Sequence, residues 1–217
     1  MTAALPLLAR LRADTRGVAL LEFAFVLPVF LVLSLTGAEL TNYIITRMRV
    51  SQMALHLADN AARIGSGSLL QAKTISEADI NDLLTGTGMQ AGELNLYTQG
   101  RVIISSLEPV ASPNTTARYK IGWQRCRGSE TSHKSSYGIA GQSSGTNMTG
   151  MGPTGRKVTA PDNGATMFVE VYYKYTPLVK TSLSPSTTMT ETASMMVRDR
   201  RDLSAVYNTE KVTASTC

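Results

Sequence analysis

The sequence predicts an α+β protein in which a long N-terminal membrane-spanning helix extends into a small antiparallel β-sheet domain. Three observations lead to this prediction: a long apolar run near the front, apolar residues at helical spacing after it, and four later runs rich in β-branched and aromatic residues. The expected segments of the 217 residues are a basic leader over 1–17, a transmembrane and amphipathic helix over 18–64, and an extracytoplasmic α+β domain over 65–217.

The apolar run begins at Gly17, continues to about Ala38 and contains a single ionisable side chain, Glu22. About 20 apolar residues are enough for a helix to cross a bilayer. A charged side chain in hydrocarbon costs about 2.5 to 3.5 kcal/mol, so an intramembrane acid is expected to have a function and a partner.

The residues around Glu22 resemble a known processing signal. A leader with Arg10, Arg12 and Arg16 is followed by Gly17, an apolar run, Glu22 at the fifth position and Phe23 after it, and this order resembles the signal of type IV pilin-like proteins. Within that superfamily, Gly17–Pro28 together with Gly37–Glu39 resembles the TadE/TadF-like minor pseudopilins of tight-adherence (Flp) pilus systems.

The resemblance covers about the first quarter of the chain, and two departures qualify it. Phe23 stands where major Flp pilins usually carry tyrosine, and the chain is far longer than a major Flp pilin. Both departures favour a minor component over the fibre subunit.

The resemblance implies a non-enzymatic minor pilin or pseudopilin that takes part in assembling a tight-adherence pilus and has a pilin-like fold. A prepilin peptidase would cut between Gly17 and Val18, and Glu22 and Phe23 would contact other pilins and pseudopilins of the pilus. Pro28 would kink or locally melt the helix so that subunits pack, or would only bend it. The alternative function is a single-span, membrane-anchored envelope adhesin or binding module unrelated to a pilus.

Two other interpretations of the N-terminal segment are open: an uncleaved anchor and an ordinary secretory signal peptide. Thr36, Gly37 and Ala38 form a small-residue stretch that suits signal peptidase, but an apolar region of about 20 residues containing an acid is too long for such a peptide. The leader arginines outnumber Arg47 and Arg49 beyond the run, which favours a cytoplasmic N-terminus. We therefore expect a single-pass protein in inner-membrane lipid, with its bulk periplasmic or extracellular and its incorporation into the pilus left open.

Helical spacing continues beyond the apolar run, so the helix is expected to reach Ile64 and to span roughly 70 Å. The residues expected on its apolar face are Ile45, Met48, Met53, Ala54, Leu57, Ala58, Ala61 and Ile64. A second helix is predicted over Ser76–Leu84, where Ser76 and Asp79 have capping-box spacing and Gly86 and Gly88 are expected to end it. These glycines lack the preceding strand and the Gly-Lys-Ser/Thr sequence of a phosphate-binding loop.

Four runs predict one antiparallel sheet, with prolines between or beside them. They are Arg101–Leu107, Ala117–Arg125, Thr166–Tyr175 and Met189–Val197. The third run mixes polar and aromatic residues with period two, so we expect one face to pack on the helix and the other to stay in water.

Residues 128–164 consist mainly of Gly, Ser, Thr and Asn, and we expect them to form a flexible loop that cannot contribute to a core. Such a loop is either a tolerated insertion or an adhesive segment acting through Tyr137, Asn147 and Met148.

The two cysteines, Cys126 and Cys217, are predicted to form a disulfide in an oxidising compartment. His133 is the one histidine near Cys126 in sequence, and no Cys-x-x-Cys or His-x-x-x-His spacing occurs, so no metal ligand set is expected.

Neither enzymatic nor nucleic-acid-binding function is predicted. His56 falls in the helical stretch and His133 in the Gly- and Ser-rich loop, and no nucleophile, base and orienting acid can be assembled from the sequence. From Val50 onward 16 basic residues face 13 acidic ones, which is a mixed, solvated surface with no basic patch for nucleic acid. No cofactor is expected.

Overall fold

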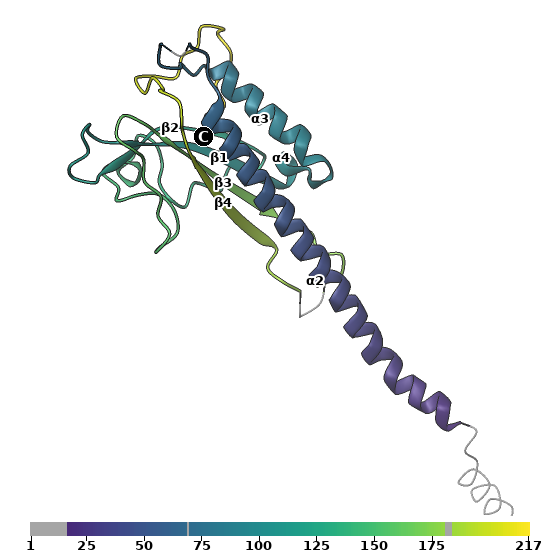
Figure 1. The fold of residues 1–217 in the computed structure, drawn as a ribbon. Coiled ribbons are helices and arrows are strands. Elements are labelled where there is room, and N and C mark those ends of the chain that lie inside the picture. The colour runs from purple at the N-terminus through teal and green to yellow at the C-terminus, as the bar shows by residue number, and fades with distance from the viewer. Residues whose placement is uncertain (1–16, 69, 181–183) are drawn as a thin grey trace, which may run out of the picture. The chain divides into compact units, whose positions relative to one another are not determined.

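The structure is a computed structural model that describes residues 17–68, 70–180 and 184–217. These residues form two compact units: the first contains the chain up to Tyr43 together with Pro177–Pro185, and the second contains Ile44–Thr176 and Ser186–Cys217. The leader arginines Arg10, Arg12 and Arg16 lie outside the described residues. The α+β class and the long N-terminal helix leading into an antiparallel sheet are confirmed (Figure 1).

Helix α2 (Val18–Arg63) is continuous over 46 residues, close to the predicted 18–64. In the second unit its buried face begins at Val50 and includes Met53, Ala54, Leu57, Ala58, Ala61 and Ala62. Ile45 and Met48 were expected on this face, but both side chains are exposed. Within the second unit, apolar side chains of the helix are therefore fully buried only from Val50 onward, although Arg47 already forms an ion pair with Glu191 on the sheet at 2.6 Å.

Arg201 closes the C-terminal end of α2. Its guanidinium is buried and donates hydrogen bonds to the carbonyl oxygens of Ala61 (3.3 Å), Ala62 (3.2 Å) and Ile64 (2.8 Å). These carbonyls have no partner within the helix, and a cation at this end also interacts favourably with the helix dipole.

Helix α3 (Glu77–Ala91) begins with the predicted capping box. The Ser76 hydroxyl accepts from the Asp79 backbone nitrogen at 3.1 Å, and the Asp79 carboxylate accepts from the Ser76 nitrogen at 2.9 Å. The predicted end at Gly86 and Gly88 is wrong, because the helix continues through both glycines and ends where Gly92 adopts a φ of 50°. The short helices η1 (Gly92–Leu94) and α4 (Leu96–Gln99) follow.

Four antiparallel strands form the sheet in the order β2-β1-β3-β4. Their bounds are β1 Gly100–Pro109, β2 Tyr119–Arg127, β3 Thr166–Lys174 and β4 Thr188–Met196. The four predicted runs match these strands to within two residues at each end. Central strand β1 is buried along nearly its whole length, so both of its faces are covered.

One face of the sheet carries a core cluster that includes residues from the segment 128–164. Leu107, Tyr119, Ile121 and Phe168 of the strands pack with Met151 and Ala160. Partly buried residues surround this cluster: Tyr137, Ala140, Met148 and Val158. The short helix η2 (Ser143–Gly145) lies within the same segment. The predictions that this segment cannot contribute to a core, and that one sheet face stays in water, are both wrong.

Candidate membrane anchor and assembly site

The Gly17–Val18 bond lies at the start of α2. Gly17 is a turn residue whose carbonyl oxygen accepts a hydrogen bond from the Leu21 nitrogen at 3.1 Å. A Cβ added at Gly17 would meet no atom within 4 Å. Nothing in the described residues therefore requires a small residue at this position.

Helix α2 up to Leu40 exposes a nearly complete coat of large apolar side chains. The exposed residues are Val18, Leu20, Leu21, Phe23, Phe25, Val26, Val29, Phe30, Leu31, Val32, Leu33, Leu35 and Leu40. This part of the helix is long and apolar enough to cross a membrane, and its apolar window is not buried within the protein. Apolar side chains exposed on all sides of a helix are stable in lipid and unfavourable in water.

Glu22 is exposed within this apolar coat, and Phe23 beside it is 58% exposed. Within the described residues the Glu22 carboxylate makes no hydrogen bond or ion pair. Val18 and Glu22 are four residues apart and therefore lie on the same face of the helix, one turn from each other. The helix also continues unbroken through Pro28, and whether it is kinked there stays a prediction.

The disulfide is present as predicted. Cys126 on β2 and Cys217 are joined across a sequence separation of 91 residues, with an S–S distance of 2.04 Å. The Cys126 backbone nitrogen also donates to the Ser215 carbonyl oxygen at 2.8 Å. Buried Arg101 donates to the backbone oxygen of Cys217 at 3.0 Å and to that of His133 at 3.0 Å. These bonds fix the last residues of the chain to the edge of the sheet.

A buried acid that the sequence analysis did not single out fixes the segment 128–164 to the sheet. Glu170 on β3 is 1% exposed and accepts hydrogen bonds from the Ser135 hydroxyl (3.0 Å) and the Ser136 nitrogen (3.1 Å). His133 Nε2 lies 3.1 Å from the same carboxylate, and its ring stacks on Tyr172 with centroids 4.0 Å apart. No sequence motif links these positions, which are more than 30 residues apart.

This cluster contains the residue types of a catalytic triad, but their spatial arrangement differs from that of a triad. A triad needs histidine between the nucleophile and the acid so that the imidazole takes the hydroxyl proton. Here Glu170 lies between Ser135 and His133 and binds both, so the histidine does not activate the serine. The arrangement suits a structural clamp.

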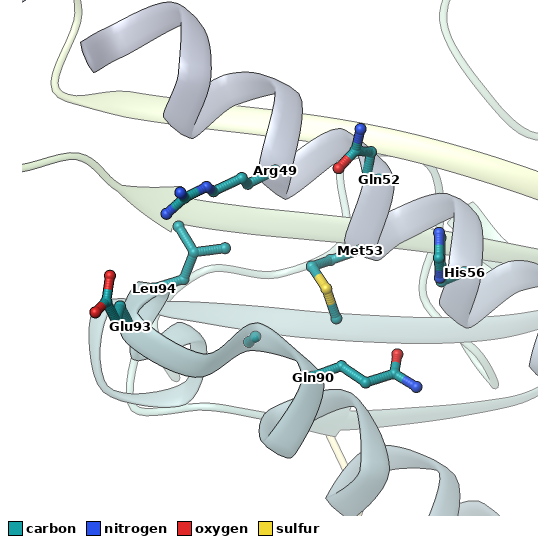
Figure 2. A pocket seen from close by; sticks show the side chains of 8 residues that line it. Arg49, Gln52, Met53, His56, Gln90, Glu93 and Leu94 are labelled. Carbon is teal, nitrogen blue, oxygen red and sulfur yellow. The ribbon is translucent and has the colours of Figure 1, made fainter.

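A groove of about 560 Å³ separates α2 from the end of α3 and η1 (Figure 2). Its lining residues are Arg49, Gln52, Met53, His56, Gln90, Ala91, Glu93 and Leu94. The buried side chains of Met53 and Leu94 form its apolar floor, and polar side chains form its rim. His56 is exposed at this rim and has no orienting acid among the described residues.

No three His, Cys, Asp or Glu side chains among the described residues are arranged to hold a metal ion. Comparison with known proteins gave no match to a family model, a curated sequence or a solved structure.

Proposed function

We propose that this protein is a minor pilin or pseudopilin that takes part in assembling a tight-adherence (Flp-type) pilus and is inserted in the inner membrane through α2. The observation that carries the proposal is Glu22, an acid on the exposed apolar half of an unbroken 46-residue helix, at the fifth position after Gly17. The TadE/TadF-like resemblance of the same residues gives this acid its assembly role.

The disulfide supports an extracytoplasmic position for the folded unit, because such bonds persist in oxidising compartments. In this proposal the N-terminus is cytoplasmic and a prepilin peptidase cuts after Gly17. Glu22 and Phe23 then contact neighbouring pilins. Two features support a non-enzymatic role. Glu170, not His133, lies between the serine and the histidine of its cluster, and His56 has no orienting acid among the described residues.

Glu22 favours assembly energetically through pairing with a positive charge. A buried carboxylate without a partner is costly in hydrocarbon, whereas pairing with the amine released at Val18 of a neighbouring subunit recovers much of that cost. Assembly therefore gains more from this charge than the isolated subunit does. If Glu22 only snorkels to the headgroups, assembly gains nothing from it.

The first test concerns processing. N-terminal sequencing of mature protein should give a start at Val18, and Gly17→Leu should leave the leader attached. A Cβ at Gly17 would meet no atom within 4 Å, so the described residues leave room for the start of this side chain. A mature start at Met1 or Glu39 would contradict the proposal.

The second test concerns assembly. Glu22→Ala and Glu22→Gln should preserve expression, membrane insertion and the Cys126–Cys217 bond, but abolish association with other pilus components and surface piliation. Glu22→Asp, which keeps the charge, is the matched control and should retain part of the association. Normal piliation with Glu22→Ala at equal protein level would leave a membrane-anchored envelope module as the function.

A further inference from the structure

The first compact unit contains a second apolar feature besides the helix, namely the turn between β3 and β4. Pro177–Lys180 of this turn belong to the same unit as α2 up to Tyr43. Leu178 is 69% exposed and Lys180 is also exposed. An exposed leucine beside a lysine is the pairing expected where a chain enters the headgroup region of a bilayer.

Glu39 holds this turn against the helix. Its side chain is 3% exposed, and its Oε2 accepts hydrogen bonds from the backbone nitrogens of Leu178 (2.8 Å) and Val179 (3.0 Å). The Ser184 hydroxyl donates to the Val179 carbonyl oxygen at 2.9 Å and closes the turn from its other side. A carboxylate that accepts two backbone N–H groups is well satisfied, so the turn has a defined height along α2.

The height follows from helix geometry. The apolar run from Val18 to Ala38 rises about 1.5 Å per residue, or about 31 Å, which matches the roughly 30 Å of a bilayer's hydrocarbon core. Glu39 is the next residue, so the turn that it holds lies at the C-terminal end of the apolar run, at the level of one membrane face. Tyr43, one helical turn further, is a residue type enriched at such interfaces.

We infer that the Pro177–Lys180 turn is a second membrane contact, in which Leu178 enters the acyl chains of the adjacent leaflet, Lys180 meets lipid phosphate and Glu39 positions the turn. The occupant is lipid because the turn is continuous with the apolar surface of α2 at a depth set by Glu39. The inference rests on the span alone and does not require a pilus.

The test uses full-length protein in lipid bilayers. The chain's single tryptophan, Trp123, is replaced by phenylalanine, and a tryptophan is introduced by Leu178→Trp. Phosphatidylcholine brominated near the top of the acyl chain should quench this tryptophan, and its emission should be shifted to the blue. Leu70→Trp in the same background is the control, because Leu70 is 89% exposed and belongs to the second unit, and it should stay unquenched.

Adding Glu39→Ala to the Leu178→Trp protein should reduce the quenching, whereas Glu39→Gln, which keeps an acceptor oxygen, should reduce it less. Quenching of Leu178→Trp no greater than that of Leu70→Trp would overturn the membrane contact. Undiminished quenching with Glu39→Ala would overturn the positioning role of Glu39. Because purified protein is used, neither result depends on pilus assembly.

Discussion

Several charged side chains are buried in the second unit, and most of their polar atoms are bonded within it. Glu170 binds three groups of the segment that covers it, and Arg201 binds the last carbonyls of α2. Burial lowers the pKa of Arg201 to about 10, so its guanidinium is still charged at neutral pH. Charges placed in this way connect segments distant in sequence, because removing one partner leaves the other unsatisfied.

Glu108 on β1 is also buried, but its carboxylate has fewer hydrogen-bond partners than that of Glu170. It is 3% exposed, and its carboxylate accepts from the Ser106 hydroxyl at 2.8 Å. Gly122 on β2 leaves room for it, because a Cβ there would lie 2.1 Å from a Glu108 oxygen. Burial raises the pKa of Glu108 above 4.5, and the hydrogen bond from Ser106 and the charge of Lys120 offset only part of this shift.

The sign of this shift gives a prediction of pH-dependent stability. Because the folded carboxyl binds a proton more tightly than the unfolded one, the free energy of unfolding falls as the pH rises from about 4.5 through the raised pKa. Glu108→Gln should remove this decline, so in urea titrations its advantage over wild type should grow as the pH rises through the raised pKa and then level off. Ser106→Ala, which removes the hydrogen bond, should steepen the decline. A stability difference for Glu108→Gln that does not change with pH would contradict the assignment.

At the scale of elements, α2 and the strands could be predicted because each has a regular apolar period or a β-branched composition. Residues 128–164 could not, because Tyr137, Met148, Met151 and Val158 follow neither period. Met151 is buried and the other three are partly buried because turns bring them onto the sheet, and Glu170 holds that segment in place. The full length of α3 was missed for a different reason: glycine weakens a helix without necessarily ending it.

Two glycines of α3 give a matched pair of substitutions. A Cβ at Gly86 would meet open space, whereas one at Gly88 would lie 2.6 Å from the ring of Tyr97. That ring is fixed, because its hydroxyl donates to the Leu84 carbonyl and Arg127 lies 5.1 Å over its centre. Burial also raises the pKa of Tyr97 to about 12.

Gly86→Ala should raise the free energy of unfolding by about 0.5 to 1 kcal/mol, because alanine loses less backbone entropy in a helix. Gly88→Ala should lower it despite the same gain, because the Tyr97 ring must move. Chemical denaturation of both variants measures the difference. Equal stabilisation by the two substitutions would show that the Tyr97 ring yields at little cost.

At the scale of the whole molecule, the sequence could predict only those residues of the candidate site that lie close together in the chain. Gly17, Glu22 and Phe23 stand in a single stretch, and their exposure on the helix follows from that stretch. The contact of Glu39 with Leu178 joins residues 139 positions apart and has no signature in composition or spacing. The disulfide was predictable because only two cysteines were available to pair.

The disulfide should stabilise the second unit over a long loop. Closing a loop of 91 residues is worth about 4 to 5 kcal/mol in the chain-entropy model. Cys126→Ser and Cys217→Ser should each lower the free energy of unfolding by up to that amount and abolish the faster migration of unreduced protein on electrophoresis. Quantitative alkylation of both thiols without prior reduction would show that the bond does not form.

The described chain combines a helix segment with exposed apolar side chains and a folded unit, and the buried apolar core belongs to the folded unit alone. Every buried apolar side chain among the described residues lies between Val50 and Val197, within the second unit. A chain of residues 44–217 exported to an oxidising compartment should therefore be soluble, disulfide-bonded and cooperatively unfolding. A chain of residues 66–217 is the control and should fail to fold, because it lacks Val50, Leu57 and the rest of the α2 core face. Circular dichroism and size-exclusion chromatography measure both. Aggregation of 44–217 would show that the core depends on the first 43 residues, and equal folding of 66–217 would show that α2 is dispensable to it.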